Sequence, residues 1–336
     1  LKNLVVVAVD RQTARTAATR HTGVSGFQVI NLDRTHWAAA LVDFFPYGGG
    51  GQSAPGVQVS RPGTPPGGAT NFYLPSVTEI PNGAYGAIVA ADRPVASIVR
   101  TDWTASGAGM AYNAPRPASD LVVPLYVKRW RGEDGAIAVM NAAAQPTDVE
   151  VTLWAADGTL AVRDAFTLGG HEPAILPLHL ASAPSIGFLG WAALHASAPI
   201  VAVGLVDDTW SAMGAYAFEA VAMANDGFSD ALAVPFVRRS ERPGVLDTAT
   251  SIWLTNPNED AATVSARYSG NTGSCAGQAF TVGPIVIPPH AMLRFDARDA
   301  GALPPNCVGS AIFSTDKRVA AVAVDSVDGG SQMAAY

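Results

Sequence analysis

Three copies of one unit follow each other along the chain. The phrases "SGAGMAYNA", "WSAMGAYAF" and "GGSQMAAY" place Tyr112, Tyr216 and Tyr336 near the ends of three similar segments. In the first and third segments an aspartate, Asp92 or Asp316, precedes the tyrosine by 20 positions without a gap (112 − 92 and 336 − 316). An internal repeat restricts the fold strongly, because each copy must form the same supersecondary unit.

Two further patterns recur upstream of these tyrosines. Apolar alternations that end in asparagine, "GFQVIN", "AIAVMN" and "SIWLTN", place Asn31, Asn141 and Asn256 at steps of 110 and 115 residues (141 − 31 and 256 − 141). Each copy also opens on an apolar run that passes into basic or polar residues: "LVVVAVDRQ", "LVVPLYVKRW" and "LAVPFVRRSE". The sequence therefore predicts three units, at residues 1–113, 118–218 and 230–336.

Short strands dominate the expected structure of each unit. In "DVEVTLWAADGTLAVRDAFTL" (148–168), apolar and polar residues alternate, "AADG" forms a turn and a return strand follows. No window carries the 3.6-residue period of a substantial helix. We therefore expect an all-β protein of three tandem antiparallel Ig-like β-sandwich domains. A single large barrel is the alternative, and the repeat argues against it.

Composition limits the partners and the setting. Charged residues make up 15% of the chain, below the ~25% of ordinary domains, and hydrophobic residues make up 49%. This indicates either a core-rich exported protein or a surface covered by other molecules, including copies of the same chain. A net charge of −7 without a large basic cluster argues against nucleic acid as a partner. No apolar run is long enough to predict a membrane span.

The two cysteines lie in turn-rich segments of the third copy, "NTGSCAGQ" and "LPPNCVGS". We expect Cys275 and Cys307 to form a disulfide, which indicates export. In the loop-entropy model such a bond contributes about 3–4 kcal/mol. Two unrelated buried thiols in a reducing compartment are the alternative. Export places the protein outside the cell or on its surface, with the export signal absent from the given sequence.

No catalytic or nucleotide-binding motif is found, so we expect neither an enzyme nor a cofactor. His171 in "GGHEPAIL" and His290 in "PPHAMLRF" attract attention as metal ligands. The first copy has Gly67 and Gly68 in the same place, "PPGGATNF", and a position that accepts glycine is typical of a turn. We therefore predict turn residues rather than a metal site.

The loops before the three tyrosines are acidic, and two of them contain tryptophan. Aspartates in such turns either bind calcium or accept hydrogen bonds from their own backbone, and we favour the second role. The aspartates concerned are Asp102, Asp207, Asp208, Asp325 and Asp328. Trp103 and Trp210 are candidates for stacking on a sugar or anchoring an interface. The alternative is that each tryptophan caps the end of a sandwich.

The repeat resembles tandem Ig-like repeats of secreted bacterial cell-surface proteins. The resemblance is clearest in the third copy, in "IPPHAMLRFDA" and "LPPNCVGSAIFSTDKRVAAVAV". The second copy departs from it, with Ser197 where the others have Asp92 and Asp316. The resemblance implies an extracellular, non-catalytic structural or adhesive protein, and it does not specify an activity.

Two functions follow as hypotheses. The first is a subunit of a self-assembled filament, sheath or lattice, whose partners are copies of itself. The second is an adhesin that binds glycans or other surface proteins through Trp103 and Trp210.

The N-terminal run "LVVVAV" is the candidate assembly segment. It has no polar alternation, which predicts a strand covered on both faces. The simplest interpretation is the opening strand of the first copy. A strand near a chain end can also be added to the exposed sheet edge of a neighbour, which would cover an edge prone to aggregation. The residues of this candidate strand are Leu4, Val5, Val6, Val7 and Val9.

Overall fold

The computed structural model describes most of the chain and shows an all-β protein. The described ranges are 2–11, 23–48, 56–103, 109–176, 180, 182–208, 215–223, 229–241, 247–299, 301–327 and 333–335. Every strand ladder in these ranges is antiparallel, and one 3-10 turn, Leu74–Ser76, is the helical element named within them. The predicted all-β class is confirmed. No helix among the described residues has the length and apolarity needed to cross a membrane.

Unit 1 comprises two four-stranded sheets, with strand orders β1-β6-β3-β4 and β5-β2-β7-β8. Its strands are β1 (Lys2–Arg11), β2 (Gly23–Asn31), β3 (Ala40–Pro46), β4 (Val57–Ser60), β5 (Ala69–Tyr73), β6 (Gly83–Ala91), β7 (Val95–Trp103) and β8 (Gly109–Asn113).

Unit 2 forms one ladder system in which the 21-residue strand β14 is shared by both layers. Its strands are β9 (Ala118–Lys128), β10 (Glu133–Asn141), β11 (Thr147–Ala155), β12 (Leu160–Leu168), β13 (Pro173–Leu176), β14 (Phe188–Asp208), β15 (Ala215–Glu219) and β16 (Val221–Ala222).

Unit 3 is built in the same way around the 21-residue strand β22. Its strands are β17 (Ser229–Ser240), β18 (Thr248–Thr255), β19 (Ala262–Gly273), β20 (Ala279–Ile287), β21 (Met292–Asp296), β22 (Cys307–Val327) and β23 (Met333–Ala335).

One pairing scheme occurs three times. In unit 2, the first half of β14 pairs with β9 and β11, and its second half pairs with β10 and β15. In unit 3, β22 makes the same pairs with β17, β19, β18 and β23. In unit 1, β6 and β7 replace the two halves of the long strand. We call the layer containing the first half the first sheet, and the other layer the second sheet.

The residue at the middle of the long strand has the same role in each unit. Asp92, Ser197 and Asp316 accept hydrogen bonds from the backbone amides of residues 39, 148 and 263, at 2.8, 3.4 and 2.7 Å. Each of these amides lies at the beginning of the strand that follows the buried asparagine. Serine can replace aspartate in unit 2 because its hydroxyl oxygen is also an acceptor.

The repeated asparagines are buried turn-forming residues. Each donates its side-chain amide to backbone carbonyls on two segments, and its Oδ1 accepts the amide two residues further on. Asn31, Asn141 and Asn256 are at most 1% exposed. Because an unsatisfied buried amide is costly, this arrangement fixes the turn after the second strand of each unit.

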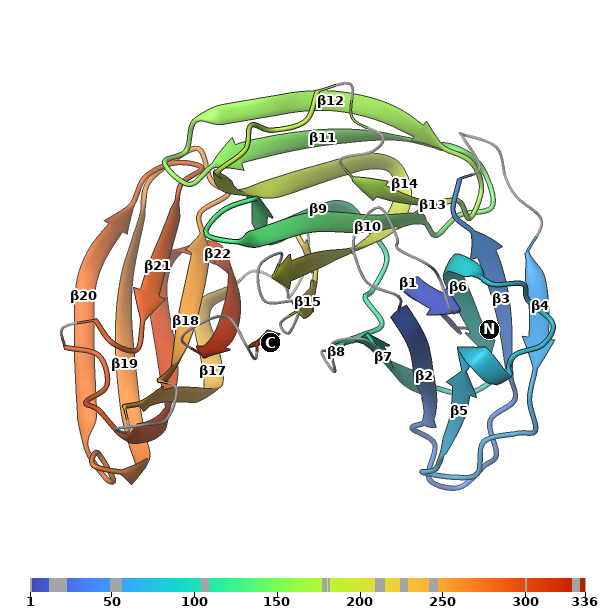
Figure 1. Cartoon of the computed structure of the whole chain (residues 1–336), viewed down its shortest axis with the longest axis horizontal. Helices are drawn as coiled ribbons and strands as arrows, with labels where there is room; N and C mark the ends of the chain where they lie inside the picture. Colours follow the sequence, from blue (N-terminus) through green and yellow to red (C-terminus); the bar gives the residue numbers. More distant parts are fainter. Residues whose placement is uncertain are drawn as a thin grey trace.

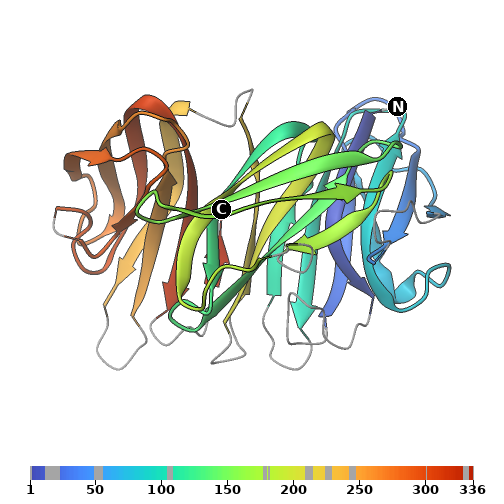
Figure 2. The same ribbon diagram turned by 90° about the horizontal axis from the view of Figure 1, so that it is seen from above.

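The three units form an arch. In Figure 1, unit 1 lies on the right, unit 2 across the top and unit 3 on the left. Figure 2 shows the same order from above, with unit 2 in the middle. The final strands β8 and β15 lie close together, as do β15 and β23, so the last described strand of each unit lies inside the arch.

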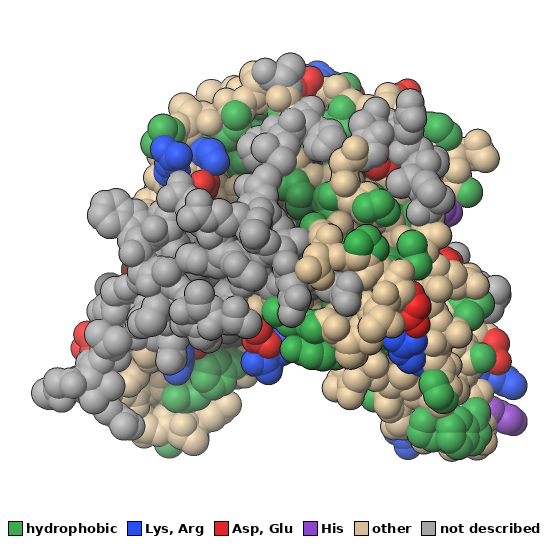
Figure 3. Space-filling model, turned by 45° about the vertical axis from the view of Figure 1, so that its right-hand side comes forward, with side chains coloured by type: hydrophobic (Ala, Val, Ile, Leu, Met, Phe, Trp, Pro, Cys, Tyr) green, Lys and Arg blue, Asp and Glu red, His purple; other side chains and the backbone are tan. Residues whose placement is uncertain are grey.

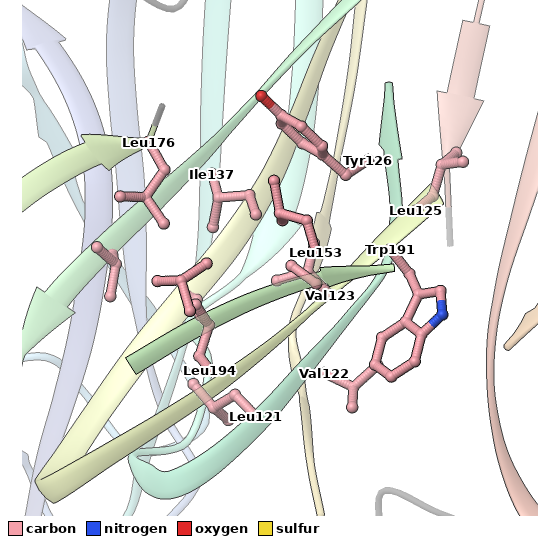
Figure 4. Packing of buried hydrophobic residues seen from close by; sticks show 14 of the residues in the cluster. Leu121, Val122, Val123, Leu125, Tyr126, Ile137, Leu153, Leu176, Trp191 and Leu194 are labelled. Atoms are coloured by element: carbon pink, nitrogen blue, oxygen red, sulfur yellow. The ribbon is translucent and has the colours of Figure 1, made fainter. Parts of the chain in front are cut away.

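The hydrophobic cores continue across the unit boundaries. One core joins unit 1 to Met140, Val203 and other residues of unit 2. A second core fills unit 2 and includes Trp253 and Val322 of unit 3. Figure 4 shows members of this second core, including Trp191, contributed by several strands. Packing of this kind joins the units through core-like interfaces rather than through linkers alone.

The two cysteines expected to pair form a disulfide. Cys275 and Cys307 have Cα atoms 5.5 Å apart. Both residues are fully buried and belong to the core of unit 3. The bond connects the turn between β19 and β20 to the beginning of β22.

Candidate functional site

The turn before the fifth strand uses the left-handed backbone region in every unit. Gly67, His171 and His290 have φ angles of 64°, 59° and 56°. Their backbone amides donate to the carbonyl oxygens of residues 33, 143 and 258, respectively. These contacts fit the turn interpretation made from the sequence. Among the described residues, no group of three His, Cys, Asp or Glu side chains is arranged to hold a metal ion.

The two histidine rings lie at the junctions between units. The ring of His171 in unit 2 lies 5.1 Å from that of Phe45 in unit 1. The ring of His290 in unit 3 stacks on Trp154 of unit 2, with centroids 4.0 Å apart and planes 8° apart. Phe45 and Trp154 occupy equivalent positions. Each lies six residues after the backbone amide, at residue 39 or 148, that donates to Asp92 or Ser197. The two junctions therefore repeat one contact.

A second equivalent position adapts the two junctions to different neighbours. Six residues before Asp92 and Ser197 lie Gly86 and Trp191. A Cβ atom at Gly86 would lie 2.6 Å from the Met140 sulfur, so glycine leaves room for the close approach of unit 2. Trp191 instead fills the space and donates its indole N–H to the His290 carbonyl at 2.7 Å.

The two outer ends of the array lack these junction side chains. In unit 3, Ser269 occupies the position of Phe45 and Trp154. In unit 1, Gly67 occupies the position of the two histidines. The position of Trp191 is Ser310 in unit 3. Terminal repeats of an array commonly replace the apolar contact residues with small or polar ones.

The second-sheet face shows the same contrast. In unit 2 this face consists of small or aliphatic side chains and is covered by unit 1; it includes Ala136, Ala138, Met140, Val203 and Leu205. On the equivalent face of unit 1, residues of units 2 and 3 approach near Ile98 and Ala111. There Gly26, Gln28, Ile98 and Arg100 occupy the positions of Ala136, Ala138, Val203 and Leu205.

Beside this contact, the same face of unit 1 is hollowed into a groove of about 590 Å³. Tyr73 is 56% exposed and Ile98 40% exposed at its surface. Arg100 and Asp102 form an exposed ion pair at 2.9 Å. Figure 3 shows the molecule turned toward unit 1, where hydrophobic side chains stand among polar ones and charged side chains are few. The groove is the candidate ligand site of the described structure.

A smaller cavity of about 380 Å³ adjoins the groove, since Ile98 and Ala111 line both. It lies where the three units meet, with Val322 of unit 3 on its far side. Glu219 lines it and accepts the backbone amide of Asn113 at 3.1 Å. Burial raises the pKa of the Glu219 carboxyl above its ordinary value, and the hydrogen bonding with Asn113 only partly offsets this.

The N-terminal strand β1 is the end strand of its sheet. Among the described strands, β1 forms a ladder with β6 alone. Its equivalent β9 pairs with β14 and is also covered on part of its other edge by β16. The equivalent β17 pairs with β18 in addition to β22. Val5 and Val6 of β1 lie opposite Ile88 and Ala87 of β6, and the side chains of β1 are outside the described residues.

The other predicted site residues fall partly outside the described structure. Trp103 ends β7, but its side chain is outside the described residues, as is the whole of Trp210. Asp325 is held by Thr250 at 3.0 Å and by Arg238 at 2.6 Å, so its carboxylate is already satisfied by protein groups. The groove itself was missed by the sequence analysis. The signal was the replacement of aliphatic residues by glutamine and arginine in the first copy.

Comparison with known proteins identifies no family. No family model matches the chain, and no curated protein matches it. Among solved structures, a Bacteroides uniformis β-glucuronidase 2, described as covalently bound to cyclophellitol-6-carboxylate aziridine, shares 9% sequence identity with a TM-score of 0.17. The alignment covers 92% of this chain and 32% of that protein, so the chain spans about a third of its length. A similarity this weak supports no functional conclusion.

Proposed function

We propose that the protein is a non-catalytic extracellular structural protein, a subunit of a self-assembled structure on a cell surface. In this proposal the three units are tandem Ig-like β-sandwich domains with the boundaries expected from the sequence. The threefold recurrence of one antiparallel pairing scheme supports the domain assignment. The disulfide between Cys275 and Cys307 supports an oxidising location outside the cytosol.

The open edge of β1 is the observation that carries the assembly proposal. A free edge presents unpaired backbone groups and pairs readily with another chain. Two other edge strands carry features that oppose such pairing: β12 contains Arg163 and Asp164, and β20 contains Pro284. Between Leu4 and Val9 the sequence has neither a charge nor a proline. A strand from a second copy would therefore join the sheet at β1.

The outer ends of the array support this choice of surface. A filament that repeated the internal junction would place Ser269 of one copy against Gly67 of the next, with no ring on either side. Such a contact lacks the aromatic packing that holds the units together within the chain.

The test is the size of the particles formed by the intact protein and by edge variants. We expect the intact protein to sediment as large particles and to show ordered polymers under negative stain. Val5→Lys and Val6→Lys each place a charge within β1, and charged side chains on an edge strand oppose pairing with another chain. A variant of this pair that folds, judged by thermal melting, is expected to stay monomeric.

Leu160→Lys on the charged edge strand β12 is the matched control and should assemble normally, because Leu160 is 48% exposed at an edge that already carries charges. Deletion of residues 1–10 should abolish polymers while units 2 and 3 remain folded. An intact protein that stayed monomeric at high concentration would contradict the proposal. Normal assembly of the deletion variant would refute the role of β1.

The alternative function, an adhesin that binds glycans or surface proteins through Trp103 and Trp210, depends on two side chains outside the described residues. The same particle-size measurement separates the two functions, because an adhesin of this kind remains monomeric.

A further inference from the structure

The groove on unit 1 has a regular construction that follows from the strand register. Across the second sheet, Tyr73 of β5, Gly26 of β2 and Arg100 of β7 lie in one row. Because Gly26 has no side chain, this row has a gap between the tyrosine and the arginine. A Cβ atom placed on Gly26 would lie 3.2 Å from the carbonyl oxygen of Phe72 and 3.7 Å from Cδ2 of Tyr73, so backbone and the edge of the tyrosine ring border the gap.

The neighbouring row supplies neutral hydrogen-bonding groups. Asn71, Gln28 and Ile98 lie side by side on β5, β2 and β7. Asn71 and Gln28 are exposed, and each side-chain amide has both donors and an acceptor. On the other side of the gap, Asp102 is paired with Arg100 at 2.9 Å, so the groove has no net charge from this pair.

The combination favours one class of ligand. An exposed aromatic ring and an isoleucine offer apolar contact, whereas the amides and the ion pair offer donors and acceptors at the rim. A pyranose ring has an apolar C–H face and a periphery of hydroxyl groups, which matches both features. The volume of about 590 Å³ lies within the ~300–1,000 Å³ range of small-ligand sites.

We propose that this groove binds a neutral oligosaccharide, with one sugar ring seated over Gly26 against the ring of Tyr73. Gln28 and Asn71 would donate and accept hydrogen bonds with hydroxyl groups on one side of the sugar, and Arg100 and Asp102 on the other. A purely solvated end of the array does not account for the exposed Tyr73 and Ile98 or for the hollow at Gly26. A second copy of this chain fits less well, because its first-sheet face of unit 3 carries the exposed Arg267, which has the same charge as Arg100.

Affinity electrophoresis through gels that contain soluble polysaccharides tests the site. The probes are four neutral polymers (laminarin, xylan, galactomannan and pullulan) and two acidic ones (alginate and polygalacturonate). We expect retardation by at least one neutral polymer, with little change between low and high salt. Tyr73→Ala should weaken this binding by roughly tenfold or more. Gly26→Val, which fills the gap with a side chain suited to a strand, should abolish it.

Trp37→Ala is the matched control. Trp37 belongs to the same unit and is 63% exposed, but it lies outside the groove, so its removal should leave the retardation unchanged. Absence of retardation by every neutral polymer overturns the proposal, as does binding to acidic polymers alone. Retention of binding by folded Tyr73→Ala and Gly26→Val variants also overturns it. Self-association that these two variants abolish would assign the groove to a second copy and overturn it as well. The groove variants leave β1 unchanged, so their failure is separate from failure of the assembly proposal.

Discussion

The two internal junctions and the two outer ends of the array use equivalent positions with different residues. At the junctions, Phe45 and Trp154 meet the rings of His171 and His290. At the outer ends the same position is Ser269, and the turn position is Gly67. The main ladders recur in all three units, although β9 and β17 make additional pairs that β1 lacks among the described strands. Stacking between units is therefore determined by a few side chains on the sheet faces and not by the fold itself.

This difference indicates that the end faces of units 1 and 3 do not reproduce the internal junction, because Gly67 and Ser269 replace its rings. A unit whose end face lacks the aromatic contact gains little by stacking on another copy, as in other repeat proteins with polar terminal faces. Association between chains must then use another surface, and the open edge of β1 is the candidate in our proposal.

The largest expected effect is the loss of a junction tryptophan. Trp191 is 1% exposed, packs in the core of unit 2 and donates to the His290 carbonyl of unit 3. Trp191→Ala should lower the free energy of unfolding by about 4 kcal/mol, measured by chemical denaturation. Ser310→Ala changes the equivalent position at the outer end and should stay within about 0.5 kcal/mol of the parent protein. Equal losses of free energy of unfolding in both variants would mean that the contacts of Trp191 at the junction do not stabilise the protein.

A smaller effect is expected from crowding the first junction. Gly86→Val places methyl groups against the sulfur of Met140 and the Cβ of Pro173, which a Cβ atom alone would already approach to 2.6 and 3.0 Å. We expect a loss of about 1–3 kcal/mol. Ser310→Val at the outer end has no unit to displace, so it should be tolerated. Thermal melting of the pair gives the comparison, and a stable Gly86→Val variant would show that the junction is loosely packed.

The junction cavity should make stability depend on pH through Glu219. Its folded-state pKa is raised by burial above the ordinary 4.5, so the folded protein binds the proton more tightly than the unfolded chain. Stability should fall as pH rises from 4.5 through the raised pKa, and the cost should be complete above it. Glu219→Gln keeps an acceptor for Asn113 and should remove this slope, making the protein more stable at pH 7. Parallel pH profiles of the two proteins would contradict the assignment.

The smallest effect is expected at the turn of unit 1. Gly67→His introduces at a φ of 64° the residue that has a φ of 59° in unit 2 and 56° in unit 3. Because no described atom lies within 4 Å of a Cβ atom placed on Gly67, the free energy of unfolding should change by less than about 0.5 kcal/mol. A large increase in the free energy of unfolding would contradict this expectation, because it would show that the new histidine ring makes a stabilising contact at this end of unit 1.

Much of the fold was predictable because the repeat marks positions with strong local constraints. Asn31 and its equivalents are required by buried turns, and Asp92 and its equivalents cap a strand, so these residues recur at regular steps. The same logic identified His171 and His290 as turn residues. Their packing against Phe45 and Trp154 was not predictable, because contacts between units depend on three-dimensional proximity that no local pattern encodes.

The candidate sites were predicted less well. The pairing of Cys275 with Cys307 followed from their isolation in one copy. The groove was missed because Tyr73, Gly26 and Arg100 are far apart in the sequence and meet only through the register of β5, β2 and β7. Trp103 and Trp210 drew attention as large aromatic residues in loops, whereas the exposed aromatic ring beside the groove belongs to Tyr73.

Hydrogen exchange of the assembled and dissociated protein tests the central claim most directly. The claim is that copies join along β1 while the end faces of the array stay free. We predict that the backbone amides of residues 2–11 exchange more slowly in the assembled form. The amides of β2 and β7 in unit 1, and of β19 in unit 3, should exchange at the same rate in both forms. Slower exchange in the end-face strands, with β1 unchanged, would contradict the claim.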